Sequence, residues 1–250
     1  MKRFVLILST CLLSAWASLA ETNGSELQEV DLELVLAADV SGSVSRELVR
    51  AQRLGFAAAF RDPDLQLALR SGPLGTVAVV YFEWAGPAHQ RLVVPWTHLS
   101  SAKEITDFAD RLEEAEQYVG GGETSISGAM QFSGRLLDDN DYEGLRKVVD
   151  IAGNGTNSAG PPVKEGLQAL RASGTIVNAL LLPGRTFADE GPYARLFRAD
   201  GEPLDAYFRN HVIGGPGSFV MSVDPETGFA DAILRKLVME VAWSIQPPSR

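Results

Sequence analysis

Cysteine and histidine are almost absent from this 250-residue sequence. The single cysteine is Cys11, and the three histidines are His89, His98 and His211. One thiol cannot build a disulfide framework or a cysteine-based metal site. No two histidines stand four residues apart, as a helical zinc-binding pair requires. The commonest zinc sites are therefore excluded, and any metal would have to be held by oxygen.

Basic clusters and catalytic serine motifs are also missing. The chain has 22 Lys and Arg against 32 Asp and Glu, a formal net charge of −10. A surface this acidic repels phosphate backbones, so nucleic acid is excluded as a partner. Ser41 is not in a G-x-S-x-G elbow, because Asp39 occupies the position of the first glycine. With no catalytic constellation in view, we expect a non-enzymatic protein.

The first twenty residues differ from the rest of the chain. Lys2 and Arg3 precede an apolar run over residues 4–13, and small residues follow at 18–20. This order is typical of a cleaved secretory signal peptide, and the apolar run is too short for a membrane anchor. We therefore expect an exported bacterial protein, periplasmic or secreted, whose mature chain has no membrane span.

Beyond this segment, apolar runs of strand character alternate with stretches of helical periodicity. Strands are predicted over residues 32–38, 76–84, 89–96, 147–152, 175–182 and 219–223. Helices are predicted over residues 44–60, from a capping box at 101–104, over 124–136, over 163–170 and over 225–244. A Gly-Pro turn joins the second and third strands into an antiparallel hairpin. The alternation predicts a doubly wound α/β fold, with a mostly parallel central sheet, one antiparallel hairpin edge and helices on both faces.

The sequence shows no linker and no internal repeat. We expect a flexible lead-in over residues 21–30, one domain over 31–244 and a tail over 245–250. The stretch from 183 to 205 is rich in Gly, Pro and acidic residues, so we expect a long loop with short helices there.

Three segments at predicted strand ends or helix starts carry small oxygen-bearing side chains. They are the run Asp39-Val40-Ser41-Gly42-Ser43, the loop 121–125 and the loop 153–157. Ligands of doubly wound sheets bind outside the carboxyl ends of the strands, where such loops meet. Carboxylate and hydroxyl oxygens suit hard cations such as Mg²⁺. These segments therefore predict an oxygen-ligated metal site.

The Asp-x-Ser-x-Ser run after a buried strand, followed by Gly-Gly-x-Thr124 and a later Gly-rich loop, resembles the von Willebrand factor type A (vWA) domain. The segments 94–97 and 212–217 are similar to an uncharacterised exported bacterial subgroup of that superfamily. The resemblance covers roughly residues 31–243. It implies a metal-ion-dependent adhesion site, in which a bound cation captures a carboxylate of a protein partner.

By that resemblance, Ser41, Ser43 and Thr124 would contact the metal directly, and Asp39 would act mainly through water. The third element of the family's site is an Asp, but this chain has Asn154 there. The resemblance thus implies Mg²⁺, or Mn²⁺ or Ca²⁺, held by Asp39, Ser41, Ser43, Thr124 and Asn154. The partner would present an Asp or Glu carboxylate.

Other interpretations of the same residues stay open at this point. Asp39 and Ser43 could cap the following helix, and Asn154 could support a left-handed turn. The site could be degenerate and free of metal, or Asp39 could be the nucleophile of a Mg²⁺-dependent phosphohydrolase. Asp150 stands four residues before Asn154, inside a predicted strand, so we expect it to be structural.

Overall fold

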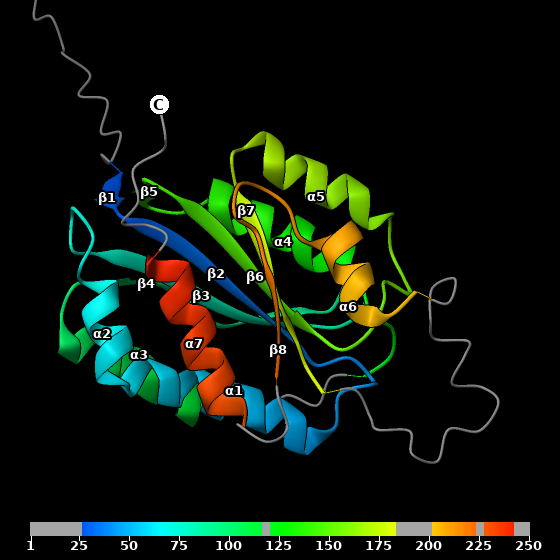
Figure 1. Cartoon of the computed structure of the whole chain (residues 1–250), viewed down its shortest axis with the longest axis horizontal. Coiled ribbons are helices and arrows are strands. Elements are labelled where there is room, and N and C mark those ends of the chain that lie inside the picture. Colours follow the sequence, from blue (N-terminus) through cyan, green and yellow to red (C-terminus); the bar gives the residue numbers. More distant parts are fainter. Residues whose placement is uncertain (1–26, 117–120, 184–201, 224–227, 243–250) are drawn as a thin grey trace, which may run out of the picture.

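A six-stranded sheet runs through the middle of the molecule in the order β4-β3-β2-β6-β7-β8 (Figure 1). The computed structural model describes residues 27–116, 121–183, 202–223 and 228–242. The strands of this sheet are β2 (Leu32–Asp39), β3 (Val77–Trp84), β4 (Gln90–Leu99), β6 (Lys147–Gly153), β7 (Ile176–Leu181) and β8 (Val220–Ser222). Neighbouring strands are parallel except for β3 and β4, which pair antiparallel at one edge. The predicted fold class is confirmed.

The central strands are buried on both faces, which is why they are nearly continuous apolar runs. Every residue of β2 and β3 is buried. Alternate residues of β2 enter two separate cores, with Leu34 and Leu36 on one face and Val35 and Ala37 on the other. The strict alternation fixes the register of β2 and therefore the place where it ends, at Asp39.

Helices cover both faces of the sheet (Figure 1). The core on the first face includes side chains of α1 (Arg46–Arg61), α2 (Pro63–Leu69), α3 (Ala102–Glu114) and α7 (Phe229–Ala242). The core on the second face includes side chains of α4 (Ile126–Asp138), α5 (Val163–Ala172), α6 (Leu204–Tyr207) and the π-helix Phe208–Val212. No helix within the described parts of the chain is long and apolar enough to cross a membrane.

Several local expectations need correction. No helix was expected directly after the one predicted over residues 44–60, but Asp62 ends α1 and also caps α2, whose first residue is Pro63. Proline is tolerated at the first helical position because its missing N–H has no partner there anyway. Residues Gln28–Val30 were expected to belong to a flexible lead-in, but they form strand β1, which pairs with β5 (Tyr142–Gly144).

Other expectations fall on residues outside the described ranges. They are the signal peptide over 1–20, the tail over 245–250 and most of the loop between 183 and 205.

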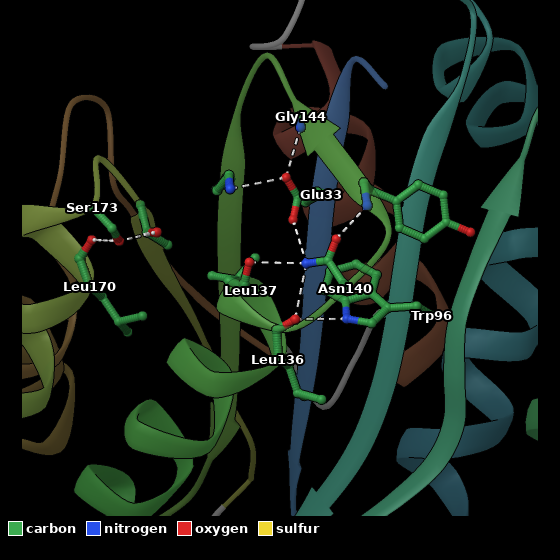
Figure 2. A network of polar contacts seen from close by, with 11 residues as sticks. Glu33, Trp96, Leu136, Leu137, Asn140, Gly144, Leu170 and Ser173 are labelled. Carbon is green, nitrogen blue, oxygen red and sulfur yellow. Dashed lines mark hydrogen bonds and ion pairs between the residues drawn. The ribbon is translucent and has the colours of Figure 1, made fainter. Parts of the chain in front are cut away.

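The buried carboxylate of Glu33 lies near the amino-terminal end of β2 (Figure 2). Glu33 accepts hydrogen bonds from the side-chain amide of Asn140 at 2.9 Å and from the N–H of Gly144 at 2.7 Å, and Lys147 lies 3.3 Å away. Asn140 also donates to the carbonyls of Leu136 and Leu137, at the end of α4. Since both carboxylate oxygens have donors, this buried acid ties β2 to the segment between α4 and β5 and is a structural group.

Candidate metal site

The candidate site lies where β2 and β6 end and α4 begins. Because β2 and β6 are parallel neighbours, their carboxyl ends meet at one edge of the sheet. Asp39 is the last residue of β2, and Asn154 directly follows the last residue of β6. The chain leaves β2 towards α1 on one face and leaves β6 towards α5 on the other. This divergence of two loops is where doubly wound sheets bind ligands.

Asp39 supplies a fully buried carboxylate at 0% exposure. Its Oδ1 accepts the N–H of Ser41 at 2.7 Å. Its Oδ2 is buried and has no hydrogen bond of standard geometry among the described residues. Burial raises the pKa of Asp39 to about 6, although the side chain and backbone of Ser41 and the backbone N–H of Asn154 favour the ionised form. An orphaned carboxylate oxygen costs free energy unless a ligand completes its contacts.

Three hydroxyls and one amide form a continuous chain of hydrogen bonds beside Asp39. Thr124 Oγ1 donates to Ser41 Oγ at 3.1 Å, and the hydroxyls of Ser41 and Ser43 are 3.2 Å apart. Ser43 Oγ donates to Asn154 Oδ1 at 2.7 Å, and Asn154 Nδ2 donates to the carbonyl of Ser43 at 3.3 Å. The structure therefore brings together all five residues predicted from the sequence. Asn154 does more than shape a turn, because its amide holds Ser43.

A close backbone approach brings the first two loops together. The N–H of Gly42 donates to the carbonyl of Gly122 at 3.2 Å. A Cβ added at Gly42 would lie 3.1 Å from that carbonyl oxygen, so a larger residue would push the loops apart. Gly122 has φ of +82°, a left-handed conformation that glycine adopts without strain. These two glycines set the distance between Ser41 and Thr124.

Two further residues position the site, and sequence reasoning missed both. The hydroxyl of Ser158 accepts the N–H of Thr124 at 2.9 Å, which ties the loop after β6 to the loop before α4. Gln52, on α1, donates its amide to the main-chain carbonyl of Asp39 at 3.0 Å. No local pattern identifies these residues, because each acts across a long separation in the chain.

Helix capping does not explain the Asp39 run. Ser45 caps α1 and Ser125 caps α4, each by accepting the N–H three residues further on. Asp39 accepts from Ser41, before α1 begins, and Ser43 donates to Asn154. The capping alternative for Asp39 and Ser43 is wrong, because neighbouring residues fill that role.

The donor set fits a hard divalent cation. It consists of three hydroxyl oxygens, one amide oxygen and the partnerless carboxylate oxygen of Asp39. Mg²⁺ prefers oxygen ligands and retains waters, so it needs few protein groups. The described residues contain no cluster of three or more His, Cys, Asp or Glu side chains that could hold a metal. A metal here would therefore rest on hydroxyls and a single carboxylate.

Asp150 and the histidines lie outside this site. The ammonium of Lys236 is 2.6 Å from Asp150 Oδ1, on the α7 face of the sheet. His211 Nε2 lies 3.3 Å from Glu202. The Ser41 hydroxyl therefore makes its hydrogen bonds with Ser43 and Thr124, and not with a histidine.

Residues 29–245 match the family described as protein of unknown function (DUF1194). The chain belongs to the DUF1194 family. No curated protein matches it. The fold of this chain is similar to that of vWA domains, as the sequence resemblance implied.

Solved structures similar to this DUF1194 chain include proximal thread matrix protein 1 of the mussel byssus, with a zinc-occupied metal-ion-dependent adhesion site. That match has a TM-score of 0.55 at 15% identity and covers 87% of this chain and 49% of the mussel protein. The pilus adhesin SpaC of Lactobacillus rhamnosus GG matches with a TM-score of 0.55 at 13% identity, over 88% of this chain and 31% of the adhesin.

BatB of Bacteroides thetaiotaomicron, a conserved hypothetical protein, matches with a TM-score of 0.50 at 15% identity, over 85% of this chain and 99% of BatB. The DUF1194 chain thus spans less than half of the mussel protein and of the adhesin, and nearly all of BatB. At these identities, the likeness concerns the fold.

Proposed function

We propose that this protein is a non-enzymatic, metal-dependent binding module of adhesion or assembly. Ser41, Ser43 and Thr124 would hold a divalent cation, foremost Mg²⁺, with Asp39 acting through water. The observation that carries the proposal is the buried, partnerless Oδ2 of Asp39 beside three hydroxyls that come from two separate loops. The bound cation would supply a positive centre to which a carboxylate can bind.

The chemistry of the site favours an acidic protein partner. Oxygen ligands bind hard cations, and a coordination position left to water can be taken by the carboxylate of an Asp or Glu. Two similar structures support the same class of function, since one has a zinc-occupied metal-ion-dependent adhesion site and the other is a pilus adhesin. We further propose that the protein works after export, in the periplasm or outside the cell.

A role of Asp39 as a phosphohydrolase nucleophile is less well supported. Its side chain is buried, and its Oδ1 is occupied by the N–H of Ser41. A nucleophile must reach the reacting atom of a substrate. The arrangement suits a carboxylate that offsets the charge of a cation.

Thermal and chemical unfolding with and without Mg²⁺ tests the proposal. At Mg²⁺ tenfold above its dissociation constant, the folded protein should gain about 1.4 kcal/mol. Ser41→Ala should lose that gain, because one ligand is removed. Ser45→Ala is the matched control: it should cost about 1 kcal/mol through loss of the α1 cap and retain the gain from Mg²⁺. Wild type without any response to Mg²⁺, Mn²⁺ or Ca²⁺ would support the metal-free alternative.

A second measurement tests the acidic partner. A fluorescent peptide with a single Asp should bind in Mg²⁺ and be released by EDTA, and its Asn counterpart should not bind. Equal binding of both peptides, or binding that survives EDTA, would contradict the proposal.

A further inference from the structure

Asn154 lies inside the site but brings no charge to it. Its Oδ1 accepts the hydroxyl hydrogen of Ser43 at 2.7 Å, and its Nδ2 donates to the carbonyl of the same residue at 3.3 Å. The amide therefore fixes Ser43 from both sides. A carboxylate at 154 could accept the first of these hydrogen bonds but could not donate the second.

Asp39 is the only acid with a hydrogen bond to this cluster among the described residues. A divalent cation bound with ionised Asp39 leaves the site at a net charge of +1. A second carboxylate at position 154 would bring the net charge to zero before any partner arrives. The affinity of oxygen sites for hard cations rises with the number of charged ligands. Holding a +1 centre at a largely buried position is unfavourable until an anion neutralises it.

We propose that Asn154 makes the metal and the acidic partner bind interdependently, so that each is held weakly alone and firmly together. This inference rests on the proposed function and adds to it a single residue that sets the coupling. The partner's carboxylate takes the place of the missing family carboxylate and completes the charge balance of the site. Because coupling between two ligands is reciprocal, the metal must raise the affinity for the carboxylate by the same factor.

Calorimetric titration of Mg²⁺, with and without saturating acetate at constant ionic strength, tests this inference. In wild type, acetate should raise the affinity for Mg²⁺ at least about fivefold, within the usual range of coupling between two sites. In Asn154→Asp, the affinity for Mg²⁺ without acetate should rise about tenfold, and acetate should change it less than about twofold.

Two control variants separate charge from other effects of the substitution. Asn154→Ala removes the amide that fixes Ser43 but keeps the charge of wild type, so it should weaken Mg²⁺ binding while acetate still raises the affinity for Mg²⁺ by a factor similar to that in wild type. Asn157→Asp introduces the same charge three residues along the same loop, where the native amide oxygen accepts the N–H of Ser127. It should therefore raise the affinity for Mg²⁺ far less than Asn154→Asp.

The outcomes distinguish this inference from the proposed function. If wild type binds none of Mg²⁺, Mn²⁺ and Ca²⁺, with or without acetate, the proposed function itself fails. If wild type binds Mg²⁺ but acetate leaves that affinity unchanged, the interdependence is overturned and the proposed function stands. The wild-type measurement decides this even if Asn154→Asp does not fold. Equal affinity for Mg²⁺ in wild type and in folded Asn154→Asp would also overturn it.

Discussion

Two buried aspartates on neighbouring strands of one sheet have opposite surroundings. Asp39 ends β2, and its Oδ2 has no partner among the described residues. Asp150 lies inside β6, with the ammonium of Lys236 2.6 Å from its Oδ1. That ammonium is also 2.5 Å from Glu240, which accepts a hydrogen bond from Asn178. Burial raises the pKa of both aspartates, to about 6 for Asp39 and about 7 for Asp150.

The difference between them separates a structural acid from a functional one. The cation that offsets Asp150 is part of the chain, on α7, so the charge of Asp150 is paired when the protein folds, although neither of its oxygens has a hydrogen bond among the described residues. Asp39 lies at the carboxyl end of its strand beside the hydroxyls of Ser41 and Ser43, and its counter-ion would come from solution. A buried acid at a strand end that lies among hydroxyls and has no ion pair within the described residues therefore points to a binding site, whereas burial and a raised pKa alone do not.

Replacing the buried Lys236 should have the largest effect on the free energy of unfolding. Lys236→Met leaves Asp150 and Glu240 buried together without a counter-charge, which should cost about 3 to 5 kcal/mol of unfolding free energy in urea titrations. Adding Asp150→Asn to this variant should restore at least half of the loss. A cost below about 1 kcal/mol for Lys236→Met would show that Asp150 is not a paired structural charge.

The pH dependence of stability should be the next largest effect. The folded pKa of Asp150 lies above its unfolded value of 3.8, so the folded protein retains a proton that the unfolded chain releases. This contribution to stability is complete below about pH 4 and is lost as pH rises towards 7. Burial is the largest cause of the raised pKa of Asp150, and Lys236 opposes it by favouring the ionised form. Urea unfolding of Asp150→Asn across this range should show a shallower fall than wild type, with the remaining fall due to Asp39 and Glu83, whose pKa values burial also raises. Identical slopes would contradict the assignment.

Widening the Asp39 site should give the smallest effect on stability but a clear one on the metal. Gly42→Ala places a Cβ 3.1 Å from the carbonyl oxygen of Gly122, so Ser41 and Thr124 move apart. The affinity for Mg²⁺ should fall about three- to tenfold in calorimetry, with an unfolding free energy within about 1 kcal/mol of wild type. Gly121→Ala is the control, since no atom lies within 4 Å of its added Cβ. Equal effects of the two variants would mean that the Gly42 contact does not set the site.

Local sequence pattern was enough to predict much of the fold and the three loops of the candidate site, and the resemblance to the vWA domain selected the five residues within them. The apolar run that ends at Asp39 marks a buried parallel strand, and strand ends are where side chains of such sheets converge. The alternation of Asp39, Ser41 and Ser43 is itself a local signal. The resemblance to the vWA domain implied that Asn154 stands where the family's site has an Asp.

The features that the sequence did not predict depend mainly on contacts between distant parts of the chain. Asp150 and Lys236 are 86 positions apart, and their pairing follows from how α7 packs on the sheet, which no local period encodes. Ser158 supports the site through hydrogen bonds with the backbone of Thr124, and Gln52 supports it through one with the backbone of Asp39. Helix α2 was missed because Asp62-Pro63 stops one helix and starts another with the same two residues.

The hydroxyl chain from Thr124 through Ser41 and Ser43 to Asn154 bears on how fast the site could change state. Each link is a hydrogen bond between side chains that already lie 2.7 to 3.2 Å apart. A hydroxyl exchanges one acceptor for another by rotating about its C–O bond, while its oxygen stays in place. The three oxygens can thus turn lone pairs towards an incoming ion as their hydrogens rotate away. The backbone carrying them need not move, so loading and release of an ion would meet little conformational resistance.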